Sequence, residues 1–300
     1  MSRSTPARCP SSTAPSSRRP DGDRPRRAPH RGAPPAGHGP TRRAVLPAWP
    51  VRIAVVAAAI GVWQLLTTQH VALGWIRFDT LPSASAVAGR LAQSVRTGEY
   101  WLDLAQSLIR IGTGFAVAAV FGIAAGVALG RSRAAELTVG TLLEIARPIP
   151  AIALVPVMIL LLPSSEAGMV AITATAAFFP IAVSVRHAVR ALPTVWEDSV
   201  RTQGGGDLAV LWRVVLPGSL PGVFSGLSVG VGVAWICLVS AEMISGRLGV
   251  GYRTWQSYTL VDYPAVFVGM LTIGVLGFLT SAVIELAGRR VTRWLPRGDR

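Results

Sequence analysis

Six long apolar segments, separated by shorter polar stretches, constrain the fold of this 300-residue chain more than any other feature. They cover residues 51–68, 104–129, 141–162, 168–188, 219–244 and 264–287, with end points good to a few residues. Each is long enough to cross a hydrocarbon core of about 30 Å as a helix. Strands are disfavoured because the runs are too long and do not alternate. The sequence therefore predicts an all-α, polytopic membrane protein with about six transmembrane helices.

The remaining composition agrees with this class. Only 15% of the residues are charged, against about 25% in soluble domains. Residues 1–46 are rich in Pro, Ser, Arg and Gly and hold few aliphatic side chains, which predicts a disordered basic tail before a membrane domain over 47–300. The net charge of +14 lies in this tail and at the ends of apolar runs, as in membrane proteins, so nucleic-acid binding is disfavoured.

Arginine in the loops predicts the orientation. The tail, the loop after the second segment (Arg131, Arg133), the loop after the fourth (residues 189–218) and the chain end are rich in arginine. The alternate loops hold fewer basic residues and some acids. Because arginine is enriched on the cytoplasmic side, both termini and the 189–218 loop are expected in the cytoplasm of a cell membrane.

The loop between the fourth and fifth segments predicts two short helices. Thr194 and Glu197 form a capping-box pattern for a helix that runs to about Gln203, where three glycines follow. Asp207 is the expected N-cap of a second helix, 208–215, which Pro217 would end. We expect the apolar side chains of the second helix, Leu208, Leu211 and Trp212, to pack on the bundle. The charged residues Asp198 and Arg201 of the first helix are expected to face outward.

This loop resembles a motif of ATP-binding-cassette (ABC) importer permeases. The family's cytoplasmic "EAA" loop has an acid, a glycine six residues later and a Val-x-Leu-Pro ending. The present chain matches this spacing with Asp198, Gly204 and Val214-Val-Leu-Pro217, although Ser199-Val200 replaces the two alanines. The resemblance extends over residues 78–297 and is closest to nitrate, sulfonate and taurine permeases. Stretches that carry it are Leu81-Pro-Ser83, Ser107–Phe115, Arg147-Pro-Ile-Pro150, Phe178–Ile181, Val233-Ala-Trp235, Ala241–Ile244 and Gly249-x-Gly251-Tyr252.

The resemblance implies partners and roles. The chain would form a translocation pore for a small anion, as a homodimer or pseudo-dimer, with ABC ATPase subunits and an external solute-binding protein. The ATPase-coupling residues would be Asp198, Arg201, Gly204, Val214, Leu216 and Pro217. No G-x-x-x-x-G-K-[ST] loop occurs, so ATP would be used by the partner and this chain would bind no cofactor.

Other functions remain open from the sequence. An importer of a vitamin precursor or an aliphatic amine fits the same family, and an ion-gradient-driven secondary transporter fits the six segments. A membrane-embedded enzyme is disfavoured, because no nucleophile elbow, HExxH or paired-carboxylate motif occurs. Cys9 lies in the tail and Cys237 in an apolar segment, so we expect no disulfide between them. His70 and His187 have no other His or Cys at a spacing that would let them bind a metal together.

Ionisable residues inside apolar segments are candidates for function because charge is costly there. Glu144 and Arg147 are three residues apart, which predicts an ion pair on one helix face. Arg147, Trp235 and Glu242 are the candidates for the pore or the gate, with Glu242 also expected to brace the outer end of the fifth segment. Glu285 is expected to reach the surface or to pair with a nearby arginine.

Overall fold

A computed structural model of the chain describes residues 48–69, 72–73, 76–77, 81–245 and 247–294. The predicted tail of residues 1–46 lies outside these residues, as do Cys9 and His70. The chain divides into two units, Met1–Val51 and Arg52–Arg300. Of the first unit only the beginning of one helix is described, so the architecture below concerns the second.

In the part of the chain that the structure describes, five helices are long and apolar enough to cross a membrane: α1 (Ala48–Thr68), α3 (Gly98–Arg131), α7 (Ser165–Arg190), α10 (Leu216–Ser245) and α12 (Tyr263–Val291). A sixth span is supplied by a bent pair, Arg133–Ala146 and Ala151–Leu161, whose two arms meet at 83°. The predicted all-helical membrane fold with about six spans is therefore confirmed, and each predicted apolar segment overlaps one of these spans.

Proline explains the bend in the third span. Its first arm consists of α4 (Arg133–Ala135), the π-helical turn η1 (Glu136–Gly140) and α5 (Thr141–Ala146). Its second arm consists of η2 (Ala151–Leu154) and α6 (Val155–Leu161). Pro148 and Pro150 lie between the arms, where missing N–H groups and fixed φ angles prevent a continuous helix. Pro156 lies in the first turn of α6, where its missing donor costs nothing.

Helix α7 lies between α3 and α10, and glycines bring both neighbours close to it. A Cβ atom built on Gly126 of α3 would lie 2.6 Å from Val185 Cβ, and one on Gly226 of α10 would lie 2.7 Å from Ser184 Cβ. Gly114, Gly122, Gly130, Gly222 and Gly230 make similar approaches to α7. These glycines therefore allow α3 and α10 to pack closely against α7, whereas Gly112 and Gly232 face open space.

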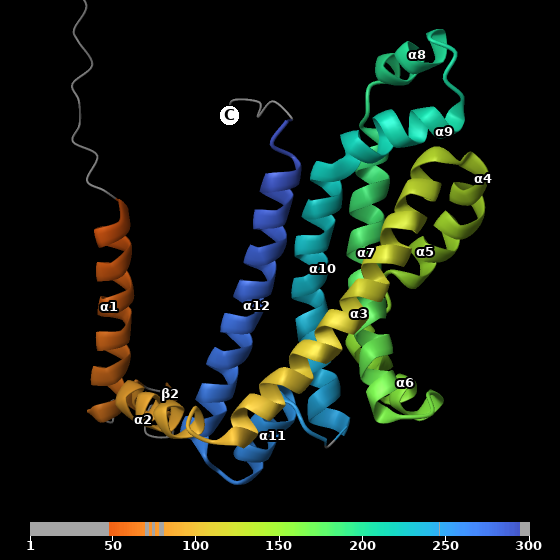
Figure 1. The fold of residues 1–300 in the computed structure, drawn as a ribbon. Helices are drawn as coiled ribbons and strands as arrows, with labels where there is room; N and C mark the ends of the chain where they lie inside the picture. Colours follow the sequence, from red (N-terminus) through yellow and green to blue (C-terminus); the bar gives the residue numbers. More distant parts are fainter. Residues whose placement is uncertain (1–47, 70–71, 74–75, 78–80, 246, 295–300) are drawn as a thin grey trace, which may run out of the picture. The chain divides into compact units, whose positions relative to one another are not determined.

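Short elements cover both ends of the bundle. Figure 1 shows α8 (Thr194–Thr202) and α9 (Asp207–Val210) at one end of α10 and α11 (Val250–Thr259) at the other; we call these the α8 end and the α11 end. Helix α2 (Ala84–Ser94) packs against α12, where Arg90 pairs with Asp262 at 2.8 Å. Strands β1 (Ala72–Leu73) and β2 (Ile76–Arg77) form an antiparallel pair.

Candidate functional sites

The turn between α8 and α9 is built by two glycines with different requirements. Gly204 has φ of +81°, a conformation that side-chain-bearing residues rarely adopt. Gly205 donates its N–H to the carbonyl oxygen of Val200 at 3.0 Å, and a Cβ there would lie 2.5 Å from the Val200 side chain. The two positions therefore fix the angle at which α8 meets the chain that leads into α10.

The start of each short helix differs from the prediction. The prediction of a capping box is wrong. Pro193 is the N-cap of α8 and makes no side-chain hydrogen bond to the helix start. The Glu197 carboxylate instead pairs with Arg131 at the end of α3, at 2.7 Å. Because its carboxylate is engaged by this arginine, it does not turn back to the helix start. Gly206, not Asp207, is the N-cap of α9, and the Asp207 carboxylate instead pairs with Arg201 at 2.8 Å.

The second helix does not end before Pro217, contrary to prediction. It continues through the π-helical turn η3 (Leu211–Val215) into α10, and the N–H of Leu216 bonds to the carbonyl of Leu211, five residues back. We attribute the continuity to this wider turn, which comes just before Pro217 and relieves the clash that a proline ring makes with the preceding turn.

The side chains of this segment that meet the bundle differ from those predicted. Leu208 and Trp212 are 69% and 65% exposed, so their predicted packing is wrong. Val210, Val214 and Val215 are buried in their place, and Leu211 packs against the core as expected. The π-helical turn inserts one residue and rotates the side chains at its end, Val214 and Val215, around the helix axis relative to a regular 3.6-residue period. Leu208 and Val210 precede the turn, and it does not explain their exposure and burial.

The six candidate coupling residues fall into two sets. Asp198, Arg201 and Gly204 are exposed, as a contact surface requires. The other three, Val214, Leu216 and Pro217, are buried or partly buried in the turn that leads into α10. The second set therefore positions the loop and does not present a surface.

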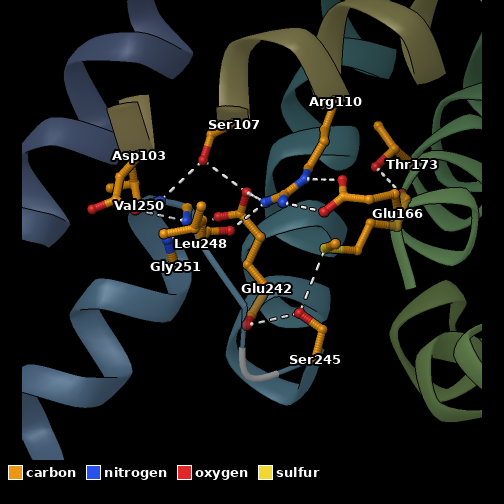
Figure 2. A network of polar contacts seen from close by, with 12 residues as sticks. Asp103, Ser107, Arg110, Glu166, Thr173, Glu242, Ser245, Leu248, Val250 and Gly251 are labelled. Carbon is orange, nitrogen blue, oxygen red and sulfur yellow. Dashed lines mark hydrogen bonds and ion pairs between the residues drawn. The ribbon is translucent and has the colours of Figure 1, made fainter. Parts of the chain in front are cut away.

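A buried polar network occupies the α11 end (Figure 2). Arg110 of α3 is 3% exposed and donates from Nη1 to Oε1 of Glu242, which is fully buried, at 2.9 Å. The same guanidinium forks onto Glu166 at the start of α7, with distances of 2.7 Å from Nε and 2.6 Å from Nη2. The hydroxyl of Ser107 donates to Glu242 Oε1 at 2.7 Å. Three spans are thus held together through one arginine.

The network also caps α11. The first N–H groups of a helix have no partner within it, and here side chains of α3 and α10 accept them. Asp103 accepts from Gly249 N at 3.0 Å, Ser107 from Val250 N at 3.0 Å, and Glu242 from Gly251 N at 2.9 Å. Negative charge at a helix N-terminus is favourable, so both carboxylates stabilise α11 as well as the helix packing.

Counter-charges balance the two buried carboxylates. Arg110 faces Glu242, and Arg253 of α11 pairs with Asp103 and, at 3.1 Å, with Glu99. Burial lowers the pKa of Arg253, but its hydrogen bonds to Asp103 and Glu99 outweigh that effect, so the pKa lies above the usual arginine value. Gly249 completes the fit: its φ is +136°, and a Cβ there would lie 2.4 Å from Glu242 Oε1.

Sequence reasoning identified Glu242 and missed the rest of this network. Complete burial of the Glu242 side chain favours a bracing role over contact with solute. The signal for its partners was present: Asp103, Ser107 and Arg110 follow a four-then-three spacing, which places them on one face of a helix. An arginine and an aspartate on one face of a long apolar run predict a buried partner of opposite charge.

The other intramembrane candidates lie apart from this network. Trp235 is 4% exposed and donates from Nε1 to Thr280 Oγ1 at 3.0 Å, which ties α10 to α12. The predicted pair of Glu144 with Arg147 is wrong, because Glu144 pairs with Arg186 at 3.0 Å, and Arg147 lies beyond the end of α5 beside Pro148. Glu285 pairs with Arg289 at 2.7 Å, which confirms its expected arginine partner.

Comparison with known proteins identifies the family. Residues 118–293 match the family described as "Binding-protein-dependent transport system inner membrane component", which is more than half of the chain. This chain belongs to that family. Within the described residues, no three His, Cys, Asp or Glu side chains gather as metal ligands would.

Individual family members agree with this assignment. A probable ABC transporter permease of Brucella abortus (strain 2308) is 30% identical over 241 residues, covering 80% of this chain and 94% of its own length. The taurine transport system permease protein TauC of Escherichia coli (strain K12) is 30% identical over 257 residues, covering 82% and 92%. An inward-facing structure of the MetNI methionine ABC transporter shares the fold, with a TM-score of 0.52 and 24% identity over 66% of this chain and 94% of the other. The chain is thus a multi-pass inner membrane component of an ABC importer.

Proposed function

We propose that this chain forms the translocation path of an ATP-driven importer for a small anion such as a sulfonate, taurine or nitrate. In this proposal the segment from Thr194 to Pro217 docks on an ABC ATPase, and an external solute-binding protein delivers the anion at the α11 end. The observation that carries the docking role is the exposed, rigidly turned α8–α9 segment between two membrane spans.

The exposed side chains of α8 and α9 support a docking role. Val195 and Trp196 on α8 and Leu208 and Trp212 near α9 are between 46% and 69% exposed, next to the charged groups of Asp198 and Arg201. Exposed aromatic and apolar side chains beside charges are typical of protein interfaces. Since α8 is joined directly to α7 and α9 runs into α10, movement of a docked partner would reach two spans.

The distribution of arginine supports the orientation. Within the described residues, the α8 end carries Arg131, Arg133, Arg186, Arg190, Arg201, Arg213, Arg289, Arg290 and Arg293. The α11 end has fewer arginines, and Arg90, Arg110 and Arg253 among them are taken up in ion pairs. The positive-inside rule then places the α8 end and both termini in the cytoplasm, where an ATPase is available.

The relatives support the anionic solute. A taurine permease aligns with four-fifths of this chain, and taurine carries a sulfonate group. The mechanism we propose is alternating access in a homodimer. ATP closes the ATPase dimer, the segment 194–217 moves with it, and the spans open outward; hydrolysis returns the path to the inward state.

Co-purification tests the docking role. The tagged chain is extracted from native membranes in mild detergent, beside Asp198→Arg and Gly204→Trp. An ATPase subunit should accompany the wild type and be lost with either variant. The matched control is Gly98→Trp, at an exposed glycine of the α11 end with no atom near its Cβ position. If no ATPase accompanies the wild type, or if the control loses it equally, the coupling assignment fails.

A further inference from the structure

A groove of about 480 Å³, with mainly apolar walls and a few polar groups, lies where the bend of the third span meets α7 and α10. Its walls include Arg147, Pro148 and Pro150 from the bend, Phe179 and Ser184 from α7, and Val229 from α10. Phe179 is near the middle of α7 (Ser165–Arg190), and Val229 is near the middle of α10 (Leu216–Ser245). The groove is therefore at about half the depth of both spans.

Arg147 is the single charged residue among those that line this groove. It is exposed, and within the described residues it makes no ion pair or side-chain hydrogen bond. It lies at the bend of the third span, and it also lines a second pocket with Glu144 and with Arg186 and His187 of α7. A charged group inside a membrane segment is costly unless it faces water or a partner. Its position thus indicates that the groove contains water and that Arg147 faces it.

The neighbouring charges are balanced without Arg147. Arg186 pairs with Glu136 and with Glu144, each at 3.0 Å, and Arg190 also pairs with Glu136. These two arginines and two glutamates neutralise one another. The positive charge of Arg147 is therefore left for whatever enters the groove.

Two further polar groups line the same groove. The Ser184 hydroxyl has no hydrogen-bond partner among the described side chains and backbone, although Ser184 lines the groove. Pro180 lies inside α7, so the carbonyl of Ala176 lacks its ordinary helical N–H donor. Among the described residues, no carboxylate lines the groove, which disfavours a cationic solute. The planar guanidinium matches two oxygens of an oxyanion at once.

We propose that this groove is the binding site for the oxyanion group of the transported solute inside the membrane, with Arg147 as its counter-charge and Ser184 as a second donor. The proposal rests on the proposed importer function. It also explains how a chain with two buried carboxylates at its α11 end still passes anions. Glu242 and Asp103 are neutralised there by Arg110 and Arg253, whereas Arg147 has no acidic partner among the described residues.

Charge-selective thiol labelling tests the site without any need for transport. In membrane vesicles that hold the full chain with Cys9→Ser and Cys237→Ala, Ser184→Cys is treated with two methanethiosulfonate reagents, one bearing a sulfonate and one a quaternary ammonium. Both should react faster than with Phe278→Cys, a control at 72% exposure near the middle of α12. The sulfonate reagent should react faster than the ammonium reagent. Arg147→Gln should reduce the ratio of the two rates about 25-fold, because unit charges about 4 Å apart change each rate about fivefold even in water, in opposite directions.

Two results would overturn the site. One is Ser184→Cys that labels no faster than Phe278→Cys, which would mean that no water reaches the groove. The other is a reagent preference that Arg147→Gln leaves unchanged. Neither result depends on finding an ATPase, so failure of the site and failure of the importer assignment remain distinguishable.

Uptake then tests the role of the site in transport. With labelled taurine as the probe, Arg147→Gln should lower uptake at least tenfold while the ATPase still co-purifies, and Arg147→Lys should retain part of the uptake. Equal uptake by the wild type and Arg147→Gln would refute the role of this arginine. If the wild type does not take up taurine, labelled nitrate replaces it as the probe, and the labelling ratio still decides whether the groove favours anions.

Discussion

Removal of Arg110 gives the sharpest test of the buried network. The Arg110→Met variant keeps most of the side-chain volume but leaves the Glu242 carboxylate, which has no exposed surface, without its counter-charge. Loss of one partner of a buried ion pair costs about 3–5 kcal/mol of unfolding free energy. We expect the upper half of this range, because the guanidinium also bonds to Glu166 and to the carbonyl of Leu248.

A second substitution should recover much of this loss. Glu242→Gln removes the charge, while its amide oxygen still accepts from Gly251 N–H and its amide nitrogen reaches Ser107. The double variant Arg110→Met with Glu242→Gln should therefore be more stable than the sum of the two single effects predicts. We expect an interaction energy of about 2 kcal/mol, within the range for residues in direct contact.

The assay is reversible unfolding in mixed micelles of SDS and a mild detergent, followed by tryptophan fluorescence. Arg289→Met is the matched control, because Arg289 pairs with Glu285 on an exposed helix face and such pairs contribute about 0.3–0.5 kcal/mol. The reasoning is refuted if Arg110→Met is no more destabilising than Arg289→Met, or if the effects of Arg110→Met and Glu242→Gln simply add.

Two further predictions concern glycines, each with an internal control and the same unfolding assay. Gly204→Ala should have an unfolding free energy about 1–2 kcal/mol lower than that of Gly206→Ala, because φ is +81° at position 204 and −78° at position 206. Equal unfolding free energies of the two variants would contradict the strained turn. Gly126→Ala should cost about 1–3 kcal/mol, since its Cβ would lie 2.6 Å from Val185. Gly112→Ala on the same helix faces open space and should be neutral or stabilising; a similar loss at both positions would argue against the close α3–α7 contact.

The spans could be predicted because hydropathy and length are local properties of the sequence. Each apolar segment became one of the six spans, and Pro148 and Pro150 lie at the break of the third. The 83° bend could not be predicted, because proline only ends a helix, while the direction in which the chain continues depends on packing against α7.

The α8–α9 segment shows where local rules fail. The Thr194–Glu197 pattern fits a capping box, but Arg131, more than sixty residues earlier, takes the carboxylate. Pro217 was expected to end a helix, yet the π-helical turn over Leu211–Val215 accommodates it. Both outcomes depend on contacts between segments distant in sequence or on an inserted residue, and neither is visible in a single helical period.

The buried network was only partly predictable for a related reason. Acids and arginines inside apolar runs are a strong signal, and Glu242 was found by it. Its partners Ser107 and Arg110 lie more than 130 residues earlier in the sequence. A pattern on one helix shows that a partner is needed, but only the tertiary fold shows which helix supplies it.

Photo-cross-linking at two matched tryptophans tests the central claim most directly. Trp196 on α8 and Trp255 on α11 are 46% and 44% exposed and lie at opposite ends of the bundle. Each is replaced in turn by a photoreactive phenylalanine analogue, and the products formed in native membranes are identified by mass spectrometry. The account predicts that position 196 links to a protein with a G-x-x-x-x-G-K-[ST] loop and that position 255 does not. A link to such an ATPase from position 255 alone, or from neither position, would contradict the coupling role of the 194–217 segment.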